Sequence, residues 1–201
     1  MITETQFDPV FDCQQIFKAL MNALARPGKI FSIAENIKKI EDKNAPLVAA
    51  GLTLLDNWKK FFASGAPDLE KILQQMTYGV PASVEEADYI FLPEGTFDLP
   101  LCQSILSQAK TGTLPEPHKS SAIFIVVDSL EGGEKRELTG PGIDGSIQIS
   151  LPQKALMWVE ERQRMNFEFP CGLELYFMTP QGGVMGIPRK TRIGGDDGWD
   201  M

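Results

Sequence analysis

The chain has 201 residues, a formal net charge of -8, 43% hydrophobic residues and 23% charged residues. This composition is ordinary for a globular protein and excludes disordered, fibrous and small disulfide-dense classes. The negative charge works against non-specific attraction to nucleic acid or anionic lipid, so neither partner is predicted.

Cellular location is predicted from the N-terminus, the apolar runs and the cysteines. The chain begins without a basic leader followed by an apolar core, and the longest apolar run, residues 47–55, is far shorter than a bilayer span. Cys13, Cys102 and Cys171 are odd in number and widely spaced, which is typical of reduced thiols. The sequence therefore predicts a cytoplasmic protein that does not enter a membrane.

The first predicted element is a helix with its N-cap at Asp12 and Gln15 at the reach-back position of a capping box. Its predicted apolar face contains four residues at helical spacing, Phe17, Leu20, Met21 and Leu24. The segment 26–28, Arg-Pro-Gly, ends this helix, and residues 29–33 are predicted to leave it as a strand.

Helices and strands then alternate along the chain. Further helices are expected at residues 46–57, 68–78 and 100–109, and strands at residues 58–63 and 88–92. The continuous β-branched and aromatic run at residues 122–127 is the best candidate for a central strand. This alternation predicts a layered α/β fold, a mostly mixed sheet with helices on both faces.

The last third is predicted to form two strand pairs separated by a helix. Strands at residues 136–139 and 146–151 flank a turn, residues 152–165 form a helix, and residues 173–179 and 184–187 form a hairpin around Gln181-Gly182-Gly183. No repeat or linker divides the chain. We therefore expect one domain over residues 1–193 and a flexible tail over residues 194–201.

No catalytic, cofactor-binding or metal-ligating residues are predicted. His118 is the single histidine, which excludes a cage built from several histidines, and neither Ser120 nor Ser121 lies in a GxSxG elbow. The neighbouring carboxylates Glu160-Glu161 and Asp196-Asp197 are interpreted as solvated charge rather than as an acid/base pair.

Two segments remain candidates for anion contact. Gly140 and Gly142 flank Pro141 in a Thr-Gly-Pro-Gly segment that is either a tight turn, the favoured interpretation, or a phosphate loop. Arg189, Lys190 and Arg192 form the densest basic spot, which is either solvated, an interface contact or a ligand clamp.

Several stretches, taken in order, resemble the PhnH family. They are residues 17–28 (FKALMNALARPG), 52–56 (LTLLD), 111–113 (TGT), 138–143 (LTGPGI), 169–175 (FPCGLEL) and 187–189 (IPR). Each is weakly specific, but the ordered set covers nearly the whole chain. Lys190 stands where the family more often carries a threonine, and the tail after Ile193 departs from the pattern.

The resemblance implies a fold similar to the large domain of pyridoxal-phosphate-dependent transferases, without the cofactor. It also implies a role in the carbon-phosphorus lyase core complex with PhnG-, PhnI- and PhnJ-like subunits. In that complex, ATP and a phosphonate are converted to α-D-ribose 1-phosphonate 5-triphosphate. The chain would be required there without being the catalyst.

Two other functions stay open, a stand-alone transferase and a small-molecule binding protein, each with its site in the α/β crevice. As a complex subunit, the chain is expected to form a homodimer when alone. The residues proposed for the interface are the aromatic group Trp58, Phe61 and Phe62, together with the Arg189 cluster.

Overall fold

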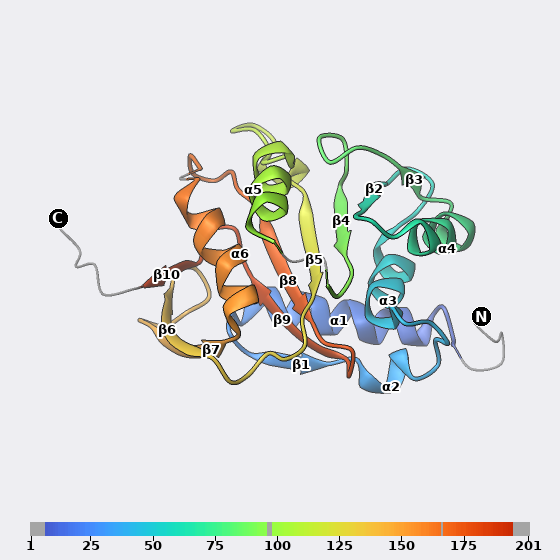
Figure 1. The fold of residues 1–201 in the computed structure, drawn as a ribbon, viewed down its shortest axis with the longest axis horizontal. Helices are drawn as coiled ribbons and strands as arrows, with labels where there is room; N and C mark the ends of the chain where they lie inside the picture. Colours follow the sequence, from blue (N-terminus) through green and yellow to red (C-terminus); the bar gives the residue numbers. More distant parts are fainter. Residues whose placement is uncertain (1–6, 96–97, 166, 195–201) are drawn as a thin grey trace.

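A seven-stranded mixed sheet forms the centre of the fold (Figure 1). The computed structural model describes residues 7–95, 98–165 and 167–194. The strand order is β1-β9-β8-β5-β4-β2-β3. Strands β3, β2, β4, β5 and β8 are parallel, whereas β9 and β1 are antiparallel to their neighbours. The strands are β1 (Ile30–Ser32), β2 (Lys60–Ala63), β3 (Val80–Pro81), β4 (Tyr89–Leu92), β5 (Ala122–Val126), β8 (Glu174–Met178) and β9 (Gly183–Ile187).

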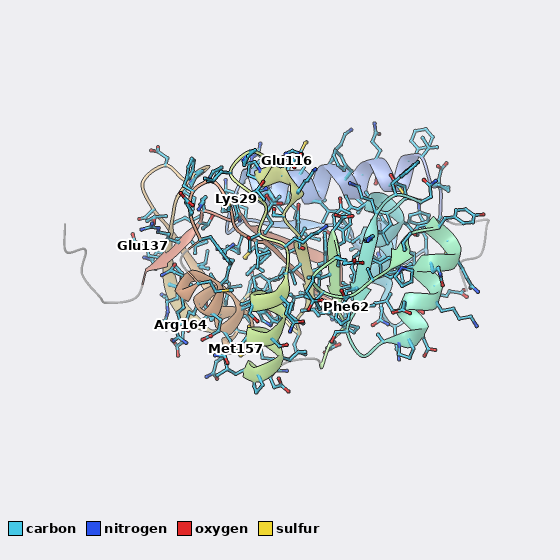
Figure 2. All side chains as sticks on the ribbon, turned by 90° about the horizontal axis from the view of Figure 1, so that it is seen from above. Lys29, Phe62, Glu116, Glu137, Met157 and Arg164 are labelled. Atoms are coloured by element: carbon cyan, nitrogen blue, oxygen red, sulfur yellow. The ribbon has the colours of Figure 1, made fainter. Side chains whose placement is uncertain are left out.

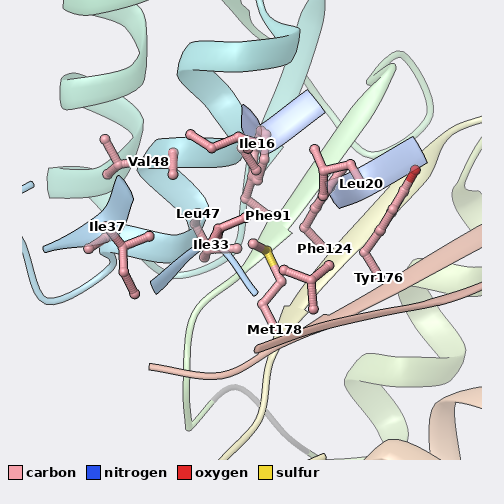
Figure 3. Close-up of a cluster of buried hydrophobic side chains, with 14 of the residues drawn as sticks. Ile16, Leu20, Ile33, Ile37, Leu47, Val48, Phe91, Phe124, Tyr176 and Met178 are labelled. Carbon is pink, nitrogen blue, oxygen red and sulfur yellow. The ribbon is translucent and has the colours of Figure 1, made fainter. Parts of the chain in front are cut away.

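Strand β5 lies in the middle of this sheet, as the sequence predicts, and all of its residues are buried. Successive side chains of a strand point to opposite faces, so Ile123 and Phe124 enter different hydrophobic clusters. On one face the ring of Phe124 stacks on that of Tyr176 with 4.6 Å between centroids (Figure 3). A strand buried on both faces needs apolar residues at every position, which explains the uninterrupted run.

Helices cover both faces of the sheet. Helices α1 (Phe11–Ala25), α2 (Ala34–Ile37), α3 (Ala45–Leu54) and α4 (Pro67–Thr77) pack on the Phe124 face, whereas α5 (Leu99–Gln108) and α6 (Gln153–Arg164) pack on the Ile123 face. The predicted α/β class, with a mixed sheet between helices, is confirmed. None of the helices in the described part of the chain is long and apolar enough to cross a membrane.

A second, three-stranded antiparallel sheet lies beside α6, with the order β10-β6-β7 (Figure 1). It comprises β6 (Glu134–Thr139), β7 (Ile147–Leu151) and β10 (Arg192–Gly194). Leu138, Ile149 and Ile193 bury their side chains in the same cluster as α6. The β6 and β7 pair was predicted, but β10 was not. Gly194 ends a strand rather than starting a tail, and residues 195–201 lie outside the described part of the chain.

The predicted N-cap of α1 is wrong, and its predicted apolar face is wrong in part. The helix starts at Phe11, and the side chain of Asp8 accepts hydrogen bonds from the amides of Val10 and Phe11, at 2.8 and 3.0 Å. Phe17 and Met21 are exposed, while the sheet-facing positions include Ala19 and Ala23. A Cβ on Gly186 of β9 would lie 2.7 Å from the backbone of Ala23. The helix therefore packs against β9 through its small residues.

Asp12, which the sequence assigned to the cap, is instead a buried link from α1 to α2 and to the segment that follows α2. Its carboxylate accepts hydrogen bonds from Asn36 at 2.8 Å, from Lys39 at 2.8 Å and from the Asp8 amide at 2.7 Å. Burial by itself raises the pKa of the Asp12 carboxyl, but the hydrogen bonds from Lys39, Asp8 and Asn36 outweigh it and lower this pKa below its usual value.

We predict that Asp12→Asn lowers the free energy of unfolding by about 2 kcal/mol at neutral pH, because charge-assisted hydrogen bonds to a buried carboxylate are lost. Because the pKa of the Asp12 carboxyl is lower in the folded than in the unfolded state, its ionised form stabilises the folded protein. This stabilisation is complete above the unfolded-state pKa and is lost as the pH falls through the folded-state pKa. The difference between the two proteins should therefore shrink below about pH 4. Urea denaturation across this range measures it, with exposed Asp144→Asn as the control. A difference that stays constant into the acid range would contradict this account.

Candidate functional site

The predicted basic cluster lies where the chain passes from the seven-stranded sheet to the three-stranded sheet. Strand β9 ends at Ile187, a turn follows, and β10 begins at Arg192. The amide of Thr191 donates to the carbonyl of Pro188 at 3.0 Å and closes the turn. Arg189, Lys190 and Arg192 are thus brought to one place by a short connection, at the end of α6.

Arg162 of α6, which the sequence analysis missed, holds this turn in position. Its side chain is buried, and its guanidinium donates to four backbone carbonyls, those of Leu173 at 3.0 Å, Ile187 at 3.0 Å, Pro188 at 2.9 Å and Thr191 at 2.8 Å. Burial lowers the pKa of Arg162 to about 10, so it stays charged at neutral pH. A single side chain therefore connects α6 to the start of β8, the end of β9 and the start of β10.

The neighbouring Gln163 adds a second connection to β10. Its side-chain amide donates to the carbonyl of Ile193 at 2.9 Å, and its side-chain oxygen accepts from the Ile193 amide at 2.7 Å. The two hydrogen bonds occupy both backbone groups of Ile193. The last turn of α6 therefore takes the place of a further strand beside β10.

The three predicted cations have different partners. Arg189 pairs with Glu174 at 2.7 Å and also donates to the carbonyl of Pro117, so it connects β8 to the loop before β5. Lys190 donates to the carbonyl of Phe167 at 3.2 Å and lies 5.4 Å from the ring centroid of Phe169. Arg192 is exposed on β10. The interpretation of a plain solvated cluster is therefore wrong for Arg189 and Lys190.

The glycine segment folds against this basic turn. Gly140 has φ +131°, and a Cβ there would lie 2.8 Å from the carbonyl oxygen of Lys190. Gly142 has φ +86°, and its Cβ would lie 3.1 Å from the carbonyl oxygen of Ala25 at the end of α1. The Ile143 amide donates to the Gly140 carbonyl at 3.1 Å, which fits the favoured interpretation of a tight turn. The glycines are needed for backbone conformation and close approach.

The aromatic group predicted at the surface is divided by the fold. Trp58 is 83% exposed, whereas Phe61 is completely buried among the side chains beneath α3 and α4. Phe62 is half-buried and packs on the opposite face of the sheet, at the position that Figure 2 labels. The expectation that Phe61 contributes to a surface is wrong, because its side chain points to the face of the sheet that α1, α3 and α4 cover.

The other residues considered for catalysis or metal binding do not lie together in one site. His118 is exposed, and the buried hydroxyl of Ser121 donates to the carbonyl of Ala87 at 2.7 Å. Glu161 is buried rather than solvated, since it accepts from Gln103 at 2.9 Å and pairs with Arg164. Figure 2 shows Arg164 on the outer side of α6. Within the residues that the structure describes, no three potential ligands are grouped to hold a metal ion.

A separate crevice lies at the carboxyl ends of β2 and β4. Its volume is about 420 Å³, and it is lined by Lys43, the Ser64–Leu69 segment and the Pro93–Gly95 segment, among others. After β2 the chain continues through α4 on one face, and after β4 it continues through α5 on the other. A divergence of this kind is where open α/β sheets commonly bind small molecules.

Comparison with known proteins gives one family and two full-length relatives. The family described as "Bacterial phosphonate metabolism protein (PhnH)" matches residues 5–194. The chain is 29% identical to the alpha-D-ribose 1-methylphosphonate 5-triphosphate synthase subunit PhnH of Rhizobium meliloti (strain 1021), over 92% of each protein. It is 25% identical to the putative C-P lyase subunit protein HtxG of Stutzerimonas stutzeri, over 90% of this chain and 85% of that protein.

We predict that Arg162→Met lowers the free energy of unfolding by about 3 kcal/mol, because four carbonyls lose their donor. Arg164→Met is the matched control, since that side chain is 69% exposed and its ion pair should contribute less than about 1 kcal/mol. Urea denaturation measures both values, and hydrogen exchange at the Ile193 amide reports on β10. Equal effects of the two substitutions would show that Arg162 has no special role in holding the turn.

Proposed function

The chain belongs to the PhnH family of bacterial phosphonate metabolism proteins, and we propose that it is a subunit of the carbon-phosphorus lyase system. It would be required there for forming α-D-ribose 1-phosphonate 5-triphosphate from ATP and a phosphonate. The observation that carries this proposal is that two relatives named as subunits align with 92% and 90% of this chain. The chain would therefore act within an assembly of PhnG-, PhnI- and PhnJ-like subunits.

Within that assembly we propose a structural role rather than catalysis. This proposal is supported by the way in which the polar side chains of the site are used. The guanidinium of Arg162 donates its hydrogen bonds to backbone carbonyls, and that of Arg189 donates to the Glu174 carboxylate and the Pro117 carbonyl. Such contacts position backbone segments relative to each other. The three cysteines are unpaired, which supports the cytoplasm as the place of assembly.

A surface suited to a partner lies at the β3 edge of the sheet. It comprises Trp58, Met76, Tyr78 and Val80, and we call it the edge patch; Trp58 is 83% exposed and Tyr78 is 77% exposed. The two rings occupy corresponding positions before β2 and β3, which pair through Lys60 and Val80. Exposed aromatic side chains are enriched at the centres of interfaces. We propose that a second copy covers this patch in the isolated protein and that a partner subunit replaces it.

Tyr78 adds a local argument for the edge patch. It ends α4 in the left-handed conformation, with φ 60° and ψ 12°, where a glycine is the usual residue. A bulky side chain is strained in that conformation. The sequence nevertheless keeps a tyrosine at this exposed place, although Gly79 follows directly. The side chain is 77% exposed and thus available to a partner.

The alternative function is a transferase or small-molecule binding protein that uses the crevice at β2 and β4. Its volume of about 420 Å³ and its place at the strand ends favour this alternative. We also propose that the fold of this chain is similar to that of the large domain of pyridoxal-phosphate-dependent transferases, with the cofactor absent. Lys43, the lysine that lines the crevice, is exposed, whereas a Schiff-base lysine is activated in a desolvated pocket.

We predict that Trp58→Ala weakens both self-association and binding of the partner subunit by about 2 kcal/mol, roughly 30-fold in the dissociation constant. Light scattering of the chain alone, then with its PhnG-like partner, measures both equilibria. Phe17→Ala is the control, because Phe17 is an aromatic residue of similar kind that is 51% exposed on α1.

The proposed subunit role would be contradicted by a wild-type chain that stays monomeric at high concentration and also ignores the partner subunits. If Phe17→Ala disrupts assembly and Trp58→Ala does not, the subunit role stands and the interface lies on α1 instead of the edge patch.

A further inference from the structure

Two helices begin at the crevice that lies at the carboxyl ends of β2 and β4, in the right half of Figure 1. Helix α3 follows Lys43 and Asn44, α4 follows residues 64–66, and all of these residues line the crevice. The crevice volume of about 420 Å³ far exceeds the roughly 10–15 Å³ that one water needs on this measure. The crevice therefore has room for a charged group together with an organic body.

Neither helix has a side-chain cap at this end. Asn44 is the N-cap residue of α3 and Ala66 is that of α4, and neither makes a side-chain capping hydrogen bond. Among the described residues, the amides of Asp68 and Leu69 in the first turn of α4 have no acceptor. Uncapped amides and the helix dipole give a helix N-terminus a partial positive charge. Two such ends at one crevice favour an anion.

Two buried polar side chains of the same crevice supply an independent observation. Asn44 and Ser64 are each only 7% exposed. Among the described residues, neither the Asn44 carboxamide nor the Ser64 hydroxyl has a hydrogen-bond partner. Asparagine is a strongly preferred N-cap residue, yet this one leaves α3 uncapped. Because buried polar groups are nearly always hydrogen-bonded, these two groups point to a ligand.

Both groups can be reached from the crevice. In the described part of the chain, the side-chain atoms that are fully enclosed without a partner belong to Trp158 and Thr191. The Asn44 carboxamide and the Ser64 hydroxyl are not among them, so they keep accessible surface, and their residues line the crevice. A carboxamide has two donors and a hydroxyl has one. Three hydrogen bonds are thus available to an anion from these side chains.

The charged residues of the crevice act in both directions. Lys43 brings an exposed ammonium group to the lining, whereas Asp68 and Glu94 bring two exposed carboxylates. Solvent and salt screen charges at exposed positions, while buried donors act in a partly desolvated place. The two carboxylates therefore weaken the binding of an anion without preventing it. Removing one of them should strengthen that binding.

We propose that this crevice binds a small molecule through a phosphate or phosphonate group, with the Asn44 carboxamide, the Ser64 hydroxyl and the first-turn amides of α4 as its donors. Donors from two helix starts and a strand end suit a tetrahedral group with three oxygens better than a planar carboxylate. The organic part of the molecule contacts Pro67 and Pro93. The inference rests on the alternative function, small-molecule binding in this crevice. It does not need the subunit role, which light scattering tests separately.

The test is titration calorimetry of the full-length chain with inorganic phosphate, methylphosphonate and ribose 5-phosphate at constant ionic strength, with acetate as the planar anion. The phosphorus compound that binds most tightly identifies the source of the group. Ser64→Ala is expected to weaken binding about 5-fold. Asn44→Asp should weaken it at least about 10-fold, because a negative charge is added beside the anion. Asp68→Asn, which removes an opposing carboxylate, should strengthen binding about 3-fold.

The same variants separate ligand binding from folding. Aspartate is as good an N-cap residue as asparagine, and the Ser64 hydroxyl has no partner to lose, so Asn44→Asp and Ser64→Ala should leave thermal stability unchanged or higher. Asn57→Asp and Ser146→Ala are the matched controls, because both residues are exposed and lie outside the crevice lining. The proposal is overturned if none of the three phosphorus compounds binds at millimolar concentration, or if acetate binds as tightly as they do. Unchanged binding in both Asn44→Asp and Ser64→Ala would also overturn it.

Discussion

Burial of the central sheet on both faces is the constraint on which the rest of this structure depends. Strands β4, β5 and β8 send alternate side chains into two separate hydrophobic clusters, so apolar residues are needed at nearly every position. Both faces must then be covered, by α1, α3 and α4 on one side and by α5 and α6 on the other. The interior is filled by side chains, and polar groups capable of binding are left at the ends of the sheet and on its outer edges.

Helix α6 connects this constraint to the candidate site. Its apolar side faces the sheet through Trp158 and Val159, while Arg162 and Gln163 in its last turns bind the backbone around β10. Burying a guanidinium without a carboxylate in direct contact is tolerated here because four carbonyls solvate it. The glycine segment packs against the basic turn through Gly140 and against the end of α1 through Gly142. Segments far apart in the sequence thus meet at one place.

The sequence predicted those elements whose signal comes from burial on both sides, above all β5, and it failed where packing or short length decides. Ala19 and Ala23 carry a weaker hydrophobic signal than Phe17 and Met21, yet the close approach to Gly186 selects the alanines. Strands β3 and β10 have two and three residues, too few for a period to be recognised. Arg162 occupies the position four residues after Trp158, on the core-facing stripe. That spacing was the available signal, but an arginine near a helix end is normally interpreted as surface charge.

The central claim, that this chain is required by a phosphonate-processing assembly without being its catalyst, is tested most directly by reconstitution. Adenine release from ATP and methylphosphonate would be measured for the chain alone, for the PhnG-, PhnI- and PhnJ-like subunits together, and for all four proteins. The account predicts release only from the complete mixture. Release by this chain alone would contradict the account, whereas full activity without the chain would remove its required role.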